Sequence, residues 1–195
     1  MATSIKTSGL KVKIYLVGIS CVGKTTIGRL LADYLGFTFY DLDDEVQKYY
    51  QKPIEIIQNE CLSMNGYRQK ASVVLDKLLK IQENSVISGT PAGLRDSYLQ
   101  VYKKHKKEIN LISVNIIDTP ENVLDRLTFY DIDSKLLDIE LIANEKKKYL
   151  KKIIVDLNYF KKSLSRADLQ ISIENMSLTE IPELISNQLK NSIIK

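Results

Sequence analysis

The chain has 195 residues, 44% of them hydrophobic, with 28 basic and 24 acidic side chains and a net charge of +4. This length suits one domain with a full hydrophobic core. The net charge is modest and the charged residues of both signs are interspersed, so the composition does not require a nucleic acid or a membrane surface as a partner. Two distant cysteines, no apolar run near the ~20 residues of a membrane span and no apolar leader favour a cytoplasmic protein. We therefore expect a single domain over residues 1–195 that is a cytoplasmic monomer.

The first predicted strand runs directly into a phosphate-binding motif. Residues 11–17 are apolar and β-branched, and residues 18–25 read G-I-S-C-V-G-K-T, which fits the P-loop pattern G-x-x-x-x-G-K-[ST]. The glycines let backbone N–H groups point at phosphates, Lys24 reaches the terminal phosphates, and the Thr25 hydroxyl can hold Mg2+. Residues 25–34 follow with helical spacing, and the N-terminus of a helix favours anions. The motif predicts a nucleoside triphosphate site made by Gly18, Cys21, Val22, Gly23, Lys24, Thr25 and Thr26.

Two carboxylates follow the second predicted strand, residues 37–40. Asp41 and Asp43 are separated by one residue, so both can reach the same cleft from a turn. A carboxylate opposite a P-loop completes the coordination of Mg2+, directly or through water, and another can hydrogen-bond the hydroxyl group of an acceptor. Alternatively, one of the two simply caps the helix that follows, and both roles can coexist.

Strands and helices alternate through the rest of the chain. Pro53 opens a short helix, His105 falls in a lysine-rich segment that reads as a solvated helix face, and Thr119 with Pro120 predicts an N-cap and the first turn of another helix. A glycine-containing turn at residues 89–93 follows a short strand. We further expect helices over residues 65–80, 136–164 and 181–189, strands over 85–88, 111–117 and 169–173, and a short polar segment over 129–135.

Repeated strand–helix units predict a parallel sheet sandwiched between helices. Ligands of such sheets bind beyond the carboxyl ends of the strands. The P-loop, the two aspartates, the turn at residues 89–93 and Asp118 all fall at strand ends. We therefore expect them to share one edge of the sheet and one active site.

The chain resembles the shikimate kinases. The resemblance covers residues 13–189 and follows the order and nearly the spacing of that family. It is carried by the P-loop and the T-I-G-R-L-L-A run after it, F-Y-D-L-D at 39–43, G-Y-R at 66–68, V-I-S-G at 86–89, V-L-D-R at 123–126, and Tyr159 with A-D-L at 167–169. It implies an α/β P-loop kinase fold, a three-layer sandwich with a five-stranded parallel sheet in the order 2-3-1-4-5 and a short lid near residues 128–137.

The resemblance also implies an activity. In that family ATP donates its γ-phosphoryl group to the 3-hydroxyl of shikimate in the presence of Mg2+. Carried over to this chain, Lys24 would stabilise the transferred phosphoryl group, and Asp43 would bind the acceptor hydroxyl and help to remove its proton. Lys135 would be the cationic residue of the lid. Lys24, Asp43 and Lys135 are therefore the implied catalytic residues.

The binding residues follow in the same way. Thr25 would bind the metal, Asp41 would support it through water, and Arg126 would lie against the adenine. Arg68 would pair with the carboxylate of the substrate, for which the planar guanidinium is suited. The implied substrate site consists of Asp43, Arg68, Gly89 and Thr90.

The departures from the family concentrate in the acceptor half. Its run of three glycines is replaced by T-P-A at 90–92, the glutamate three positions after the arginine is Ala71, and the lid keeps only Lys135 as a positive charge. A second carboxylate-binding arginine would fall at Val155, which cannot make that contact; substitution by the nearby Lys151, Lys152 or Lys161 stays open, although nothing in the sequence requires it. We expect a kinase with shikimate as its acceptor. A kinase for another small hydroxylated acceptor and a catalytically silent ATP-binding protein with a regulatory or partner role stay open.

Overall fold

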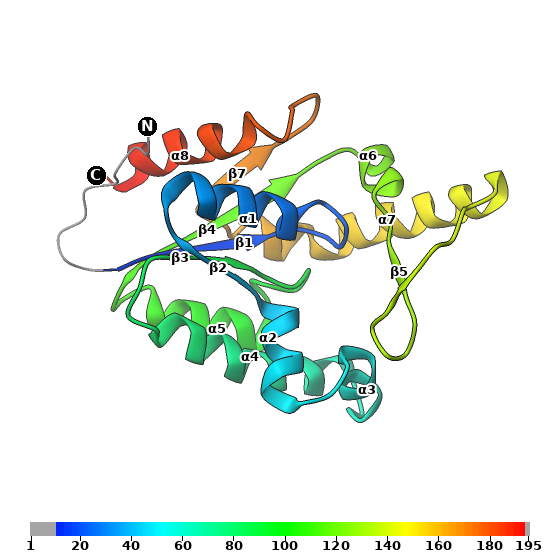
Figure 1. The fold of residues 1–195 in the computed structure, drawn as a ribbon, viewed down its shortest axis with the longest axis horizontal. Coiled ribbons are helices and arrows are strands. Elements are labelled where there is room, and N and C mark those ends of the chain that lie inside the picture. Colours follow the sequence, from blue (N-terminus) through cyan, green and yellow to red (C-terminus); the bar gives the residue numbers. More distant parts are fainter. Residues whose placement is uncertain (1–10, 194–195) are drawn as a thin grey trace.

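The computed structural model describes residues 11–193 and has a five-stranded parallel sheet at its centre (Figure 1). The sheet consists of β1 (Val12–Val17), β2 (Thr38–Asp41), β3 (Ser85–Ser88), β4 (Asn110–Ile117) and β7 (Leu169–Ser172). Its spatial order is β2-β3-β1-β4-β7, so β7 is the fifth strand of the sheet along the chain and the predicted order 2-3-1-4-5 is confirmed. No helix among residues 11–193 is long and apolar enough to cross a membrane.

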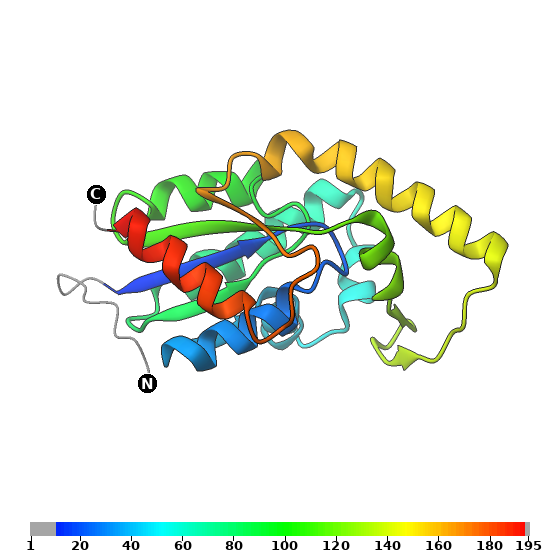
Figure 2. The ribbon, with the colours of Figure 1, turned by 90° about the horizontal axis from the view of Figure 1, so that it is seen from above.

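The helices lie on both faces of this sheet. They are α1 (Lys24–Leu35), α2 (Leu42–Tyr50), α3 (Ile54–Asn59), α4 (Met64–Lys80), α5 (Asp96–His105), α6 (Pro120–Asp125), α7 (Ala143–Leu164) and α8 (Ile181–Ile193). In Figure 1, α1 and α8 lie together on one face and α4 and α5 on the other. The predicted α/β sandwich is therefore confirmed, and α6 and the start of α7 extend beyond the carboxyl ends of the strands (Figure 2).

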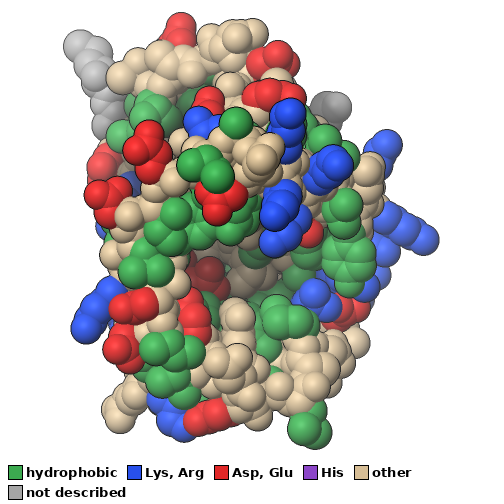
Figure 3. Space-filling view, turned by 90° about the vertical axis from the view of Figure 1, so that its right-hand side faces the viewer, with side chains coloured by type: hydrophobic (Ala, Val, Ile, Leu, Met, Phe, Trp, Pro, Cys, Tyr) green, Lys and Arg blue, Asp and Glu red, His purple; other side chains and the backbone are tan. Residues whose placement is uncertain are grey.

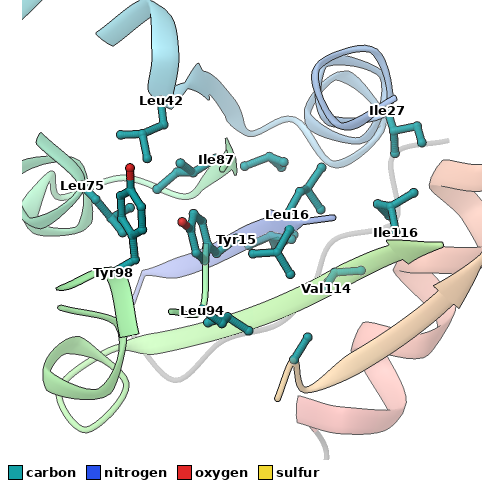
Figure 4. Packing of buried hydrophobic residues seen from close by; sticks show 14 of the residues in the cluster. Tyr15, Leu16, Ile27, Leu42, Leu75, Ile87, Leu94, Tyr98, Val114 and Ile116 are labelled. Carbon is teal, nitrogen blue, oxygen red and sulfur yellow. The ribbon is translucent and has the colours of Figure 1, made fainter. Parts of the chain in front are cut away.

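The core packs on both sides of the central strand β1. Every residue of β1 is buried, and its side chains alternate between the two faces. Tyr15 packs with Leu94 and with Tyr98 of α5 on one side, whereas Leu16 lies toward Ile27 of α1 on the other (Figure 4). Burial on both faces fixes β1, and with it the start of the loop that follows.

A small hairpin occupies the residues for which the sequence predicts a lid. β5 (Phe129–Tyr130) pairs with β6 (Leu136–Leu137), and the Ser134 hydroxyl between them donates to Glu55 Oε2 of α3 at 2.5 Å. The expected helix over 136–164 is therefore wrong in its first seven residues, because α7 begins at Ala143. Ile139 and Ile142 have helical spacing in the sequence but are exposed outside the helix, since no element packs against them.

Two further expectations need correction. Residues 42–50 form α2; the sequence left open that Asp41 or Asp43 caps a helix here but predicted no bounds for it, because its first turn contains D-D-E and its apolar positions are few. His105 is buried rather than solvated, and its Nε2 lies 2.8 Å from Asp76 Oδ1 of α4. The lysines around His105 cover the outer face of α5, whereas His105 itself lies on the inner face.

Candidate functional site

The loop between β1 and α1 has a conformation that its glycines permit. Gly18 and Gly23 have φ values of +148° and +103°, a range that favours glycine, and Gly23 is the N-cap of α1. A Cβ atom at Gly18 would lie 2.8 Å from the carbonyl oxygen of Ile116, too close for another residue. The loop therefore curls tightly around the N-terminus of α1, where the backbone N–H groups have no partner within the helix.

Lys24 is buried, and its ammonium group folds back on this loop. Its Nζ donates to the carbonyl oxygens of Gly18 at 3.0 Å and Ile19 at 2.8 Å. Burial lowers the pKa of Lys24, whereas the nearby Asp43 and Asp41 act in the opposite direction. The two carbonyl contacts hold the ammonium group at the centre of the loop, where an anion would compete for it.

Asp41 makes one contact with each of its oxygens. Oδ2 accepts a hydrogen bond from the Thr25 hydroxyl at 2.7 Å, and Oδ1 accepts from the backbone N–H of Asp43 at 3.0 Å. The second contact makes Asp41 the N-cap of α2. Capping and a role opposite the P-loop are therefore compatible in one side chain, as the sequence left open.

Oxygen atoms suited to Mg2+ meet at this contact. The Thr25 hydroxyl and the Asp41 carboxylate are hard oxygen ligands, and Mg2+ at phosphate sites takes one or two protein oxygens and completes its shell with water and phosphate. Among residues 11–193, no group of three or more His, Cys, Asp or Glu side chains could hold a metal by itself. The residues present fit a magnesium ion that arrives with a phosphate, and do not fit a site built from protein ligands alone.

Asp43 lies in the first turn of α2 and contacts α4. The Tyr67 hydroxyl of α4 donates to Asp43 Oδ1 at 3.3 Å. Burial, and then the charge of Asp41, raise the pKa of Asp43 to about 6, while Lys24 and the hydrogen bond from Tyr67 oppose this shift. A carboxylate with such a pKa is charged at neutral pH and can accept a proton from a bound group.

Two cavities open at the carboxyl edge of the sheet, and Asp43 lines both. Their volumes are about 850 and 550 Å³, within the range of small-molecule sites. Figure 3 shows this end of the molecule as a hollow with acidic side chains on one side and Lys and Arg side chains on the other. The residues common to both cavities are Ser20, Asp43, Gln58 and Pro91. A ligand in each cavity would therefore meet its neighbour at Asp43.

The larger cavity gathers most of the residues predicted to bind nucleotide and metal. It is lined by Cys21, Gly23, Lys24, Thr25, Thr26, Asp41 and Arg126, among others. Gly18 and Val22 do not line it; Gly18 shapes the loop from below, and the Val22 side chain is buried in the core. Arg126 forms an ion pair with Asp118, and its Nε donates to the carbonyl oxygen of Cys21 at 3.3 Å.

The smaller cavity gathers the predicted substrate residues Arg68 and Thr90, with Asp43 at its junction with the larger one. Gly89 lines the larger cavity instead, and its place in the loop depends on its size, because a Cβ atom there would lie 2.6 Å from the Tyr15 ring. Pro91 and Ala92 also line the smaller cavity, so the residues that replace the family's glycines form part of its wall.

Lys135 is not brought into either cavity. It is exposed in the hairpin between β5 and β6, and among the described lid residues it is Thr128, Tyr130 and Ser134 that line the larger cavity. The hairpin therefore borders the larger cavity, but its Lys135 does not line that cavity.

Sequence reasoning missed several lining residues of the smaller cavity. Tyr67 belongs to the G-Y-R sequence at residues 66–68, which was noted only for its arginine. Its position directly before Arg68 is the sequence signal that could have identified it. Asp156 and Phe160 of α7 and Gln58 of α3 also line this cavity. No local motif marks these three positions, because only the packing of α3 and α7 against the edge of the sheet brings them there.

A comparison with family profiles matches residues 20–152 to the family described as shikimate kinase. Among curated proteins, the chain is 29% identical to the shikimate kinase of Persephonella marina over 178 residues, which cover 91% of this chain and 98% of that protein. It is 30% identical to the shikimate kinase of Nitrosomonas europaea over 131 residues, which cover 67% of this chain and 59% of that protein.

Solved structures show the same fold. The shikimate kinase of Bacteroides thetaiotaomicron has a TM-score of 0.75 at 20% identity, covering 92% of this chain and 98% of that one. The shikimate kinase of Acinetobacter baumannii, solved in complex with shikimate, has a TM-score of 0.71 at 24% identity, covering 96% and 97%. A gluconokinase from Sinorhizobium meliloti has a TM-score of 0.63 at 15% identity, covering 94% of both chains. At these identities the structural likeness establishes the architecture.

Proposed function

The chain belongs to the shikimate kinase family, an ATP-dependent kinase family, and we propose that it transfers the γ-phosphoryl group of ATP to a hydroxyl group of shikimate. The observation that carries this proposal is the junction of the two cavities. One is lined by most of the P-loop, including Lys24 and Thr25, the other by Arg68, and Asp43 lines both. A phosphoryl donor and a hydroxylated acid placed in them would meet at the carboxylate best suited to take a proton.

On the donor side, the loop residues bind the phosphates of ATP and Arg126 lies beside the base. The backbone N–H groups at the start of α1 and the ammonium group of Lys24 supply fixed positive charge where negative charge develops. Lys24 exchanges its two carbonyl contacts for the terminal phosphate oxygens. Because little covalent chemistry is required in phosphoryl transfer, positioning and charge neutralisation account for most of the catalysis.

Thr25 and Asp41 would hold Mg2+, Thr25 directly and Asp41 through water. The ion, when bound with ATP, neutralises charge on the β- and γ-phosphates. The hydrogen bond between the two side chains keeps their oxygens 2.7 Å apart, and the capping contact of Asp41 to Asp43 fixes the orientation of the carboxylate.

On the acceptor side, Asp43 accepts the proton of the acceptor hydroxyl. The acceptor oxygen forms a bond to the γ-phosphorus as the bond from that phosphorus to the bridging oxygen of ADP breaks, and the proton passes to Asp43 and then to solvent. Arg68 pairs with the carboxylate of the acceptor, and Thr90 lines the same cavity. Lys135 would reach the phosphates only when the hairpin closes.

The proposal is tested by ADP formation from Mg-ATP with and without shikimate. We expect shikimate-dependent turnover that is lost in Lys24→Ala, and a fall in kcat of roughly a hundredfold or more in Asp43→Asn with ATP binding kept, because a positioned general base contributes about that much. Asp33→Asn, at an exposed position on α1 that lines neither cavity, is the matched control and should keep activity.

The outcomes separate the three readings that the sequence left open. Unchanged turnover in Lys24→Ala would overturn the P-loop assignment, and unchanged transfer in Asp43→Asn would remove the proposed base. ATP binding without stimulation by shikimate would direct the search to other hydroxylated acids. ATP binding without turnover on any such acid would favour a silent nucleotide-binding protein.

A further inference from the structure

Two arginines from different elements meet at one carboxylate oxygen beside the smaller cavity. Arg68 of α4 places NH1 3.0 Å from Asp96 Oδ2, and Arg95, the residue before α5, places Nε 3.3 Å from the same oxygen. The side chains of Arg68 and Arg95 are 12% and 32% exposed, and that of Asp96 is 37% exposed. Two guanidinium groups are thus already arranged around a single carboxylate oxygen.

Arg68 has N–H donors that its ion pair with Asp96 does not use. It lines the smaller cavity, and it is the one cation among the described residues that do so. Its Nε is buried and has no hydrogen-bond partner, although a guanidinium group offers five N–H donors in a planar fork. A buried donor without a partner is costly, so the site favours a ligand oxygen that would satisfy it.

Arg95 does not itself line this cavity, but it contacts a residue that does. Its Cζ lies 4.4 Å from the centre of the Tyr159 ring, and Tyr159 of α7 lines the cavity. Stacking on the ring and pairing with Asp96 restrict the guanidinium group before any ligand binds, which lowers the entropy lost on binding. Val155, where the family resemblance would place a second arginine, is exposed and does not line the cavity.

The carboxylates that line the smaller cavity determine at which end the carboxylate of a ligand is stabilised. Asp43 and Asp156 are the described carboxylates that line it, and both disfavour an anion near them. A carboxylate is therefore stabilised only toward Arg68 and Arg95. An acceptor bound in this direction would extend the rest of its ring toward the junction with the larger cavity.

We propose that Arg68 and Arg95 together bind the carboxylate of the acceptor, and that Asp96 occupies them until the acceptor arrives. Asp96 Oδ2 stands in for an oxygen of the incoming acid. Binding exchanges this internal ion pair for a bidentate one with the ligand, which also satisfies Arg68 Nε. The inference rests on the proposed function and adds to it a specificity-determining residue, Arg95, and a competing internal acid, Asp96.

The test compares shikimate with its carboxamide, which has the same ring and no charge. We expect Arg95→Met to raise the KM for shikimate about tenfold or more, as loss of a charged hydrogen bond does, with kcat and the KM for ATP little changed and the KM for the carboxamide unaltered. Asp96→Asn should lower the KM for shikimate, because the competing charge is gone. Lys103→Met removes an exposed cation from α5 and should change nothing.

Calorimetric titration of shikimate in the presence of ADP separates this inference from the proposed function. If shikimate binds more weakly to Arg95→Met than to the unmodified protein, the inference is supported even when no turnover occurs. Absence of turnover counts only against the proposed phosphoryl transfer. Equal losses for shikimate and the carboxamide, an unchanged KM in Arg95→Met, or no binding of shikimate by the unmodified protein would overturn it. Arg95→Lys, which keeps the charge and loses the fork, should be intermediate if the protein is folded and the pairing is direct.

Discussion

Asp41 shows how one side chain serves the local structure and the site together. A carboxylate has two oxygens, and here one caps α2 while the other faces the Thr25 hydroxyl. The cap stabilises the start of a helix whose first turn is crowded with acids, a favourable placement near the positive end of the helix dipole. The capping bond also orients the second oxygen, Oδ2, toward the Thr25 hydroxyl of the P-loop. The D-x-D spacing is therefore explained by the geometry of a helix start as much as by chemistry.

The hydrogen bond from the Tyr67 hydroxyl should have a measurable effect on the pKa of Asp43. Because its hydrogen bond favours the charged form, Tyr67→Phe should raise the pKa of Asp43 further above about 6. Transfer needs the charged form, so activity falls below this pKa, and the fall in kcat/KM toward acid should begin at higher pH in the variant. We expect a several-fold loss at pH 6 and little change at pH 8.

The pH profile distinguishes this role from simple packing. Tyr50→Phe removes a hydroxyl that donates to the backbone oxygen of Lys70, far from any carboxylate, and should leave the profile where it is. A profile of Tyr67→Phe that superimposes on that of the unmodified protein, with activity lowered equally at every pH, would contradict an effect on Asp43.

At the scale of elements, the buried strands were the predictable part. The strands at residues 85–88 and 169–172 and the cap at Thr119 with Pro120 lie within a residue of their expected places, because short apolar runs between turn residues have few other uses. The error at residues 136–142 has the opposite cause. Apolar residues at helical spacing indicate a helix only if something packs on them, and here they extend along an exposed lid.

His105 illustrates what composition cannot reveal. Its lysine neighbours indicate a solvated helix face, yet one residue in each turn of α5 must face the core, and His105 is at that position. Its partner Asp76 also accepts hydrogen bonds from Lys80 at 2.5 Å and Lys104 at 2.9 Å. A carboxylate with three donors links α4 to α5, and no sequence pattern connects positions 29 residues apart.

The Asp76 cluster predicts how stability depends on pH. Burial alone would raise the pKa of Asp76, but the hydrogen bonds from Lys80, Lys104 and His105 outweigh it and hold the pKa below its usual value. A depressed pKa stabilises the folded state above the unfolded value of about 4, and this contribution is lost as the pH falls below it. Asp76→Asn should therefore cost about 1–3 kcal/mol near neutral pH.

Urea unfolding at several pH values checks this. The difference between Asp76→Asn and the unmodified protein should shrink steadily below about pH 4, because the Asp76 carboxylate takes up a proton in the unfolded state there while it stays charged in the folded state. Asp33→Asn, a change at an exposed position on α1, should give no difference at any pH. A difference that stays constant down to pH 3 would mean that the charge of Asp76 does not matter.

At the scale of the molecule, the sequence predicted that the candidate site residues share one edge of the sheet, but not that two cavities open there. Parallel strands place their carboxyl ends at one edge, so the loop after β1, the aspartates after β2 and the turn after β3 had to meet there. The acceptor cavity additionally needs α3 and α7, which pack over that edge through contacts distant in sequence. Arg95 could not be predicted from the sequence for the same reason, because its proposed role depends on its position near Arg68 and Tyr159 in the fold.

The hairpin lid carries the last prediction, which concerns Lys135. The hairpin is held to α3 by the hydrogen bond from Ser134 to Glu55, and it borders the larger cavity, which the exposed Lys135 does not line. If closure brings this cation to the transferring phosphoryl group, Lys135→Met should lower kcat by about a hundredfold, as removal of one charge-stabilising donor does, and change the KM for ATP much less. Lys135→Arg should restore part of the loss, and Lys147→Met, at an exposed position on α7, should be silent. An equal rise in the KM for ATP with kcat kept would instead make Lys135 a residue that binds the nucleotide uniformly, because ground state and transition state would then lose the same contact.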